Sequence, residues 1–167
     1  MLIRPATDDD LPRVAAIYAE HVRTGTGSFE EVPPSPGEMA ERHAVVVAAG
    51  CPWLVAERDG LLLGYAFAGP WKARSAYRFT VEDSVYVAPG HARRGIGSAL
   101  LGRLIEDCTA RGYRQLMAVT GDGENTGSVA LHRRHGFRVV GTARGIGFKF
   151  GRWLDVVYLQ RELAPPP

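Results

Sequence analysis

The stretch from Val85 to Leu101, "VYVAPGHARRGIGSALL", restricts the fold of this chain more than any other. Its β-branched and aromatic residues are typical of a strand, Pro89-Gly90 ends that strand, and a helical pattern follows Gly97. The backbone N–H groups of a glycine-rich turn bind anions, and the following helix adds a partial positive charge. Glycines at 95 and 97 also let the backbone approach a bulky anion closely. The stretch therefore predicts either a diphosphate-binding turn or a strand–helix turn whose glycines serve tight packing.

Two common nucleotide-binding motifs do not match this turn. A P-loop needs Gly-Lys-Ser/Thr, whereas this chain has Gly97-Ser98-Ala99. A dinucleotide fingerprint needs a third glycine where Leu100 stands, and it opens a βαβ unit. Here the pattern before the turn predicts an antiparallel meander instead. The glycines alone thus support the anion site and the packing turn about equally.

The remaining pattern predicts one α/β domain of the α+β type over residues 1–163, with a loose tail over 164–167. A helix is expected to begin at Thr7 or Asp8, and Arg58-Asp59-Gly60 is a hairpin signal. The residues from Gly25 to Pro36 are expected to form a loop. Strands are expected over 3–7, 53–57, 61–68, 78–87, 115–120, 137–142 and 153–163, and further helices over 36–49, 98–111 and 126–135.

Composition excludes several classes of function. The chain has 167 residues, 46% hydrophobic and 23% charged, as is usual for one globular domain. No window approaches about 18 consecutive apolar residues, and no secretory signal is visible. Cys51 and Cys108 lie far apart and suggest no disulfide framework, and the net charge of +2 is too small to indicate nucleic acid. We expect a cytoplasmic protein with no membrane, nucleic-acid or metal partner.

Two blocks of the sequence resemble a known superfamily. "VEDSVYVAPGHARRGIGSALL" resembles the acyl-CoA-binding core of the GNAT acyltransferases, whose turn reads Gln/Arg-x-x-Gly-x-Gly/Ala, and "ENTGSVALHRRHGF" resembles their second block. Nearly the whole chain is similar to the phosphinothricin and methionine sulfoximine N-acetyltransferase branch, most specifically at residues 69–74 and 150–155. Ala92 departs from the motif, which has Gln or Arg there, and the neighbouring arginines are expected to substitute. The loop over 121–124 is one residue longer than in such relatives.

The resemblance implies a GNAT-like fold and a co-substrate. The sheet would be mixed and mostly antiparallel, with about seven strands, about four flanking helices and a splay between the fourth and fifth strands. The co-substrate would be acetyl-CoA, whose pantetheine arm pairs with the backbone of Val85, Tyr86 and Val87. Backbone N–H groups around Tyr86 and Val87 would also hold the oxyanion. The expected acetyl-CoA contacts are Val85, Tyr86, Val87, Arg93, Arg94, Gly95, Ile96, Gly97, Ser98, Ala99, Asn125 and Ser128.

Glu82 and His132 are the candidate catalytic residues. A glutamate within an apolar strand is unusual unless it is paired or functional, and the resemblance makes Glu82 the general base that deprotonates an amine. Asp83 would face the other side of the strand and serve a structural role. His132 stands where the superfamily often has a tyrosine that protonates the leaving thiolate, and its pKa range suits that role. A solvated glutamate and a packing histidine are the alternatives, and His135 is expected to end the helix.

The acceptor is expected to be a small molecule with an amine and a carboxylate. The cluster of Lys72, Arg74 and Arg78 suits a carboxylate, and Phe29, Trp71 and Tyr77 are candidate pocket walls. Their alternatives are surface charge and core packing. Phe29 matches a pocket residue of the phosphinothricin branch, but Glu30 and Glu31 follow it where that branch has a basic residue. The exact acceptor therefore stays open.

These observations predict direct acetyl transfer from acetyl-CoA to the amine of methionine sulfoximine, phosphinothricin or a related amino acid, in a ternary complex. A non-catalytic acyl-CoA sensor is an alternative, although it would not need Glu82. An acetyltransferase acting on protein amines is another, although the basic and aromatic residues favour a small acceptor. A cysteine acyl-enzyme is disfavoured because no histidine lies near Cys51 or Cys108 in the sequence. The resemblance also implies a homodimer.

Overall fold

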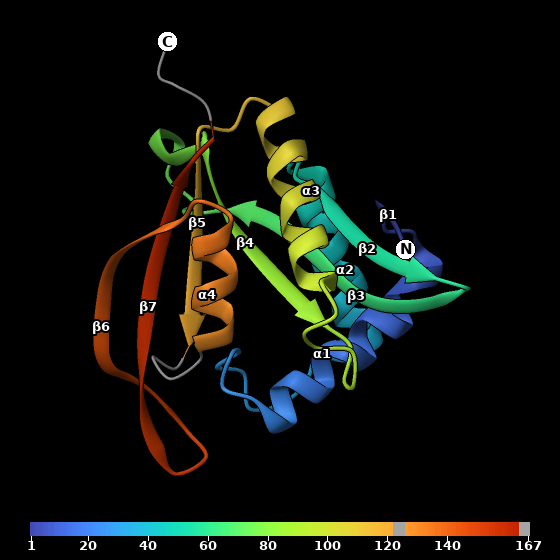
Figure 1. The fold of residues 1–167 in the computed structure, drawn as a ribbon, viewed down its shortest axis with the longest axis horizontal. Coiled ribbons are helices and arrows are strands. Elements are labelled where there is room, and N and C mark those ends of the chain that lie inside the picture. Colours follow the sequence, from blue (N-terminus) through green and yellow to red (C-terminus); the bar gives the residue numbers. More distant parts are fainter. Residues whose placement is uncertain (122–125, 164–167) are drawn as a thin grey trace.

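The computed structural model describes residues 1–121 and 126–163 and contains one seven-stranded sheet (Figure 1). The strand order is β1-β2-β3-β4-β5-β7-β6. The strands are β1 (Leu2–Pro5), β2 (Trp53–Arg58), β3 (Leu61–Pro70), β4 (Thr80–Val87), β5 (Gln115–Gly121), β6 (Arg138–Lys149) and β7 (Arg152–Glu162). The helices are α1 (Leu11–Thr24), α2 (Pro36–Ala48), α3 (Ile96–Ala110) and α4 (Thr126–Arg134), with short 3-10 turns η1 (Asp8–Asp10) and η2 (Ser75–Tyr77). The predicted fold class is confirmed.

The sheet opens between its two middle strands. β4 and β5 run parallel and pair only over Thr80–Glu82 with Gln115–Met117, whereas the other neighbouring strands run antiparallel. Beyond this point β4 stays paired with β3 as far as Val87, while β5 stays paired with β7 as far as Gly121. The two strands therefore diverge toward their carboxyl ends (Figure 1), which confirms the predicted splay.

Helices cover both faces of the sheet. α1 and α2 lie on one face, and α3 and α4 lie on the other (Figure 1). The predicted apolar stripe of α3 is fully packed into the core, since Leu100, Leu101, Leu104, Ile105 and Cys108 are all buried. Such burial of one helical face is what holds a helix on a sheet. No helix of the described ranges has the length and apolar character needed to cross a lipid bilayer.

Several predicted boundaries move for local reasons. The hairpin prediction is confirmed, since Asp59 and Gly60 both have the positive φ of a two-residue turn (53° and 75°). Strand β4 begins at Thr80 and not at Arg78, because the chain first makes η2 and the Arg78 N–H bonds the Ser75 carbonyl. Strand β6 runs to Lys149, seven residues past the predicted end at residue 142. The strand contains three glycines, and its pairing with β7 shifts register between Val139 and Gly141 and between Ala143 and Gly147.

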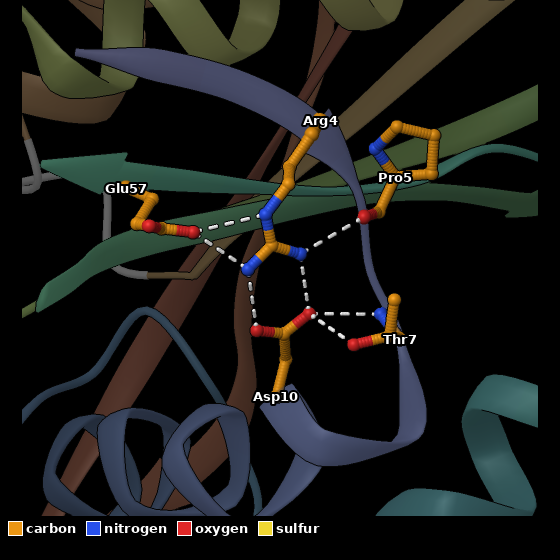
Figure 2. Close-up of polar contacts among 5 residues, drawn as sticks. All are labelled: Arg4, Pro5, Thr7, Asp10 and Glu57. Carbon is orange, nitrogen blue, oxygen red and sulfur yellow. Dashed lines mark hydrogen bonds and ion pairs between the residues drawn. The ribbon is translucent and has the colours of Figure 1, made fainter. Parts of the chain in front are cut away.

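The start of α1 is tied to the edge of the sheet by an ionic cluster (Figure 2). Arg4 on β1 makes a bidentate contact with Asp10 (2.7 and 2.8 Å) and also bonds Glu57 on β2 (2.7 and 2.9 Å). Asp10 in turn accepts from the backbone N–H of Thr7 at 2.8 Å. The helix itself starts at Leu11, because Thr7 caps the η1 turn first. The Arg4 guanidinium holds the pKa of the Asp10 carboxyl at about 2.

Candidate active site

The glycine turn leads directly into α3 and is open to solvent. Gly95 is the N-cap of α3 and has a left-handed backbone (φ 79°), as does Arg93 (φ 59°), so glycine is the favoured residue at position 95. The first N–H groups of α3 have no partner within the helix, which makes this end suitable for an anion. Of the predicted diphosphate contacts, Arg93, Arg94, Gly95 and Ser98 are exposed, Gly97 and Ala99 are half-buried, and Ile96 is buried. The turn is therefore accessible to a ligand, as a binding site requires.

The Ser98 hydroxyl already has a hydrogen-bond partner within the protein. This hydroxyl lies 2.8 Å from Nε2 of His135, which follows the last residue of α4. His135 was expected only to end the helix, and it does lie in the final turn, where its N–H bonds the His132 carbonyl at 3.0 Å. Burial and the nearby Arg161 lower the pKa of the His135 imidazole.

A cleft of about 150 Å³ occupies the splay between β4 and β5. Its walls come from both strands, from α4, from α1 and from the loop after α1. They are His21, Gly27, Asp83, Ser84, Val85, Tyr86, Val119, Thr120, Ser128 and His132. The cleft thus brings together four residues predicted from the sequence, namely Val85, Tyr86, Ser128 and His132. Val87, another predicted contact, is not among these walls, and its carbonyl oxygen already accepts a hydrogen bond from His21 Nε2 at 2.8 Å. Asn125 lies outside the described residues.

His132 is buried in the cleft wall, and both of its ring nitrogens are engaged. Nδ1 lies 2.7 Å from the carbonyl oxygen of Ser128, and Nε2 lies 3.2 Å from Oδ1 of Asp83. Because a carbonyl oxygen only accepts hydrogen bonds, Nδ1 carries a proton. An attractive contact between Nε2 and Oδ1 then requires one proton between those atoms, on the imidazole or on the carboxyl group. The two residues therefore share a proton inside the protein.

Electrostatics agree with this sharing. Both side chains are almost wholly buried, and burial opposes either charge. Burial raises the pKa of the Asp83 carboxyl group, although His132 opposes the rise. Burial lowers the pKa of His132, but Asp83 and the Ser128 carbonyl together outweigh that effect, so the pKa is raised. The second oxygen of Asp83, Oδ2, has no hydrogen-bond partner among the described residues, so the carboxyl group is oriented mainly by His132.

Glu82 lies where the splay begins. Its Cα is paired with Gly69 of β3 and with Met117 of β5, so the strands part immediately after it. Tyr86, which shares its face of the strand with Glu82, packs against α1, whereas Asp83 contacts α4. Glu82 and Asp83 therefore lie on opposite faces of the sheet, as predicted. Its cross-strand neighbour Gly69 has no side chain, and the space beside it is open.

The Glu82 carboxylate has the properties of a general base. Burial raises its pKa, Asp83 raises it further, and Lys72 opposes the rise. No residue of the described ranges donates a hydrogen bond to this carboxylate. A half-buried, unbonded carboxylate of raised pKa can accept a proton from an incoming amine.

The basic residues and the predicted wall residues do not form one wall. Lys72 and Arg78 are exposed and lie over the rings of Trp71 (4.7 Å) and Phe79 (4.6 Å), respectively. Arg74 and Tyr77 are exposed on the same loop, before the start of β4. Phe29 instead lies at the carboxyl end of the neighbouring β5. Because β4 and β5 run parallel, this end is opposite to the one that carries the basic loop. Trp71 and Tyr77 thus lie with the basic residues before β4, and Phe29 alone lies at the opposite end of the strands.

Phe29 occupies a slot made by two glycines on different strands. A Cβ atom on Gly121 of β5 or on Gly147 of β6 would collide with the Phe29 ring. The same loop is held by Lys149, whose ammonium group donates to the carbonyl oxygens of Gly25 (2.9 Å) and Ser28 (2.8 Å). The loop between α1 and α2 is therefore fixed against the β6–β7 hairpin.

Sequence reasoning missed Lys149, His21 and the partnership of Asp83 with His132. The partners of Lys149 lie more than 120 residues away, and those of His21 and Asp83 lie 66 and 49 residues away. No local spacing marks such pairs. The one available signal was Lys149 itself, a charged residue within a glycine- and aromatic-rich segment.

Comparison with known proteins decides the family. Residues 14–137 match the Acetyltransferase (GNAT) family. The chain belongs to the GNAT family. The opened sheet, with a glycine turn at the end of β4, is thus the GNAT arrangement, and the predicted resemblance is confirmed.

Individual GNAT proteins are similar over almost the full chain. A phosphinothricin N-acetyltransferase of Alcaligenes faecalis is 56% identical over 161 residues, which are 96% of this chain and 82% of that protein. An L-methionine sulfoximine/L-methionine sulfone acetyltransferase of Pseudomonas paraeruginosa is 41% identical, over 98% of this chain and 95% of that protein. A phosphinothricin acetyltransferase from Sinorhizobium meliloti, solved in complex with AcCoA, is 44% identical with a TM-score of 0.95, and the match covers 98% of this chain and 88% of that one.

Proposed function

We propose that this GNAT protein transfers an acetyl group from acetyl-CoA to the amino group of a small amino-acid-like acceptor. Methionine sulfoximine, methionine sulfone and phosphinothricin are the candidate acceptors, since relatives that share most of the chain carry these names. The observation that carries the proposal is Glu82, an unbonded and half-buried carboxylate at the point where the cleft between β4 and β5 opens.

The proposed reaction is a direct attack in a ternary complex. The amine passes a proton to Glu82, and its nitrogen attacks the thioester carbonyl carbon. A C–N bond forms, the C–S bond breaks, the thiolate of CoA leaves, and the nitrogen gives up its second proton to the solvent. Backbone N–H groups near Tyr86 and Val87 would stabilise the oxyanion. The thiolate takes a proton that we assign to the pair of Asp83 and His132, which shares a proton at the wall of the same cleft.

Acetyl-CoA would lie with its diphosphate on the turn over residues 93–99 and its pantetheine arm in the cleft. The exposed N-terminus of α3 and the two arginines support the first contact. The unpaired edge of β4 beyond Glu82 supports the second. Asn125 and Ser128 remain predicted contacts of the arm. A covalent cysteine route is disfavoured, because burial raises the pKa of the Cys108 thiol to about 12.

The acceptor carboxylate is proposed to meet the basic loop that carries Lys72, Arg74 and Arg78. Lys72 lies near enough to Glu82 to lower its pKa, which supports a carboxylate site beside the base. Trp71, Tyr77 and Phe29 stay candidate walls. A protein amine as acceptor would need an open groove, which the same basic and aromatic loop disfavours.

Thiol release from acetyl-CoA with methionine sulfone, methionine sulfoximine, phosphinothricin and ordinary amino acids tests the proposal. We expect turnover with at least one of these acceptors, and weaker acetyl-CoA binding when Arg93 and Arg94 are both changed to alanine. Arg103→Ala, an exposed change on α3, is the control. Tight acetyl-CoA binding by calorimetry with no turnover on any amine would support the sensor alternative, and no binding at all would exclude both.

We further propose a homodimer formed through the β6–β7 hairpin. This hairpin exposes Ile146, Phe148, Phe150 and Trp153, the last of which is 70% exposed. Apolar groups gathered in this way mark an interaction surface. Trp153→Glu is expected to convert a dimer to a monomer in sedimentation analysis, and a wild-type monomer would contradict the proposal.

We also propose that residues 1–163 form a single N-acetyltransferase domain that acts in the cytoplasm. Cys51 and Cys108 are both free thiols in the described structure, which suits a reducing compartment.

A further inference from the structure

A second cavity, of about 160 Å³, lies on the α1 and α2 side of the sheet. It shares two wall residues, Ser84 and Tyr86, with the cleft in the splay, so the two hollows meet at β4. Its other walls include Trp53, Tyr65 and Phe67. None of these three was assigned a role in acetyl transfer.

The strand register brings this cavity within reach of Glu82. Trp53, Phe67 and Ser84 are paired across β2, β3 and β4, and Glu82 is two residues from Ser84 along β4. Residues two apart on a strand point to the same face and are separated by about 7 Å. Gly69 stands opposite Glu82 and leaves the intervening space open. An amino acid with its amine at Glu82 can therefore extend its side chain toward Trp53.

The cavity walls favour an apolar group that also carries a hydrogen-bond acceptor. The rings of Trp53 and Phe67 are stacked with centroids 4.2 Å apart, and Trp53 also stacks on Tyr65 at 5.9 Å. Trp53 is only 3% exposed, and its indole Nε1 has no hydrogen-bond partner among the described residues. A buried N–H without a partner is costly, and a ligand oxygen would satisfy it.

The charges around the cavity cancel. Arg42 makes a bidentate contact with Glu30 (2.6 and 3.1 Å), and the Tyr18 hydroxyl also donates to Glu30 at 2.8 Å. The nearby Lys149 is bonded to two carbonyl oxygens and lies close to Glu31 as well as Glu30. The one basic side chain of the lining, Arg42, is thus paired with the one carboxylate of the lining, Glu30, and an anionic ligand would gain no net attraction here.

We propose that this cavity is the side-chain pocket of the acceptor and that it selects an uncharged side chain ending in a methyl group beside an S=O oxygen. Methionine sulfone and methionine sulfoximine carry such a group, whereas the side chain of phosphinothricin ends in an anionic methylphosphinate. The inference rests on the proposed function for its use of Glu82 and acetyl-CoA. The Nε1–H of Trp53 donates the hydrogen bond to the ligand oxygen, and the ion pair of Arg42 with Glu30 disfavours an anionic side chain.

Selectivity measurements test the pocket. We expect wild-type kcat/KM to be higher for methionine sulfone than for phosphinothricin. Trp53→Phe removes the N–H and is expected to lower kcat/KM for the sulfone about tenfold, with methionine changed less than twofold. Glu30→Gln frees the Arg42 charge and is expected to raise the ratio of phosphinothricin to sulfone about tenfold. Trp153→Phe and Glu106→Gln, an exposed change on α3, are the controls, and neither should change these ratios.

A binding measurement separates this inference from the proposed function. The indole ¹⁵N–¹H resonance of Trp53, assigned by its loss in Trp53→Phe, is expected to shift when methionine sulfone is added with CoA. This readout needs no turnover. If wild type acetylates amino acids but both variants keep its ratios and the resonance does not move, the pocket assignment is overturned while the function stands. If no acceptor is acetylated, the function fails, and an unmoved resonance then overturns the pocket as well.

Discussion

Nε2 of His132 lies 3.2 Å from Oδ1 of Asp83, in a contact buried between α4 and β4. The carbonyl oxygen of Ser128 holds the other ring nitrogen, so the imidazole cannot turn without losing a bond. Asp83 is therefore a positioning residue that acts through His132. The pair sits at the wall of the cleft that acetyl-CoA is proposed to enter.

Changing Asp83 to asparagine should lower the pKa of His132. Burial lowers that pKa, whereas Asp83 and the hydrogen bond to Ser128 raise it. Without the carboxylate, only the Ser128 bond opposes the effect of burial. The basic limb of the kcat profile should then move to lower pH, because His132 loses its proton earlier. Histidine NMR titration of the variant measures the change. Asp107→Asn, in an exposed ion pair, is the control. An unchanged His132 titration would exclude the coupling.

Glu82→Gln should remove the acidic limb of the kcat/KM profile. In the wild type this limb is expected above the ordinary carboxyl range, because burial and Asp83 raise the pKa of Glu82, and the rate should rise with pH through it. Loss of a general base typically costs about 10² to 10⁴ in rate. Acetyl-CoA affinity by calorimetry should stay as in the wild type. Glu106→Gln on the exposed side of α3 should leave the rate unchanged. Full activity in Glu82→Gln would rule out its role as base.

Gly147→Ala should displace Phe29 from its slot. The added methyl group collides with the ring, and overpacking of this kind costs about 1 to 3 kcal/mol in the free energy of unfolding. We expect a lower Tm and a higher KM for the acceptor, with the KM for acetyl-CoA unchanged. Gly141→Ala, on the same strand with nothing within 4 Å of the new Cβ, is the matched control. Equal effects of the two changes would contradict the slot.

Lys149→Met should loosen the loop between α1 and α2. The change leaves the carbonyl oxygens of Gly25 and Ser28 without their ammonium donor, at a cost of about 1 to 3 kcal/mol. Denaturant unfolding measures the loss, and hydrogen exchange should increase over residues 25–29. The exposed Lys72→Met should leave the free energy of unfolding unchanged. Unaltered exchange in the loop would show that Phe29 alone holds it.

Asp10→Asn should make the free energy of unfolding less dependent on pH in acid. The folded-state pKa of about 2 lies below the ordinary Asp value of about 4, so the stabilisation is full above pH 4 and is lost as pH falls toward 2. The variant should be about 2 kcal/mol less stable at pH 7, and the difference should shrink through that window. Asp9→Asn, at an exposed neighbouring position, is the comparison. A difference that persists at pH 2 would mean that Asp10 acts through packing and not through its charge.

The sequence by itself determined the features that depend on neighbouring residues. The apolar stripe of α3 follows from helical spacing, the turn at Asp59-Gly60 from its residue types, and the glycine turn before α3 from the same local chemistry. The splay and the GNAT fold came from two motifs of fixed spacing. Local pattern did not give the full length of β6, which was predicted to end at residue 142 but stays paired with β7 as far as Lys149.

Only the tertiary structure decided which distant side chains meet. Asp83 contacts His132, Lys149 donates hydrogen bonds to the loop after α1, and Phe29 packs against two glycines on separate strands. It also separated Phe29 from the basic loop, although both were expected at one pocket. These contacts depend on strand order and register, which bring together residues tens of positions apart in the chain. Periodicity along a sequence reports only which face a residue occupies, and the partner on that face is chosen by packing.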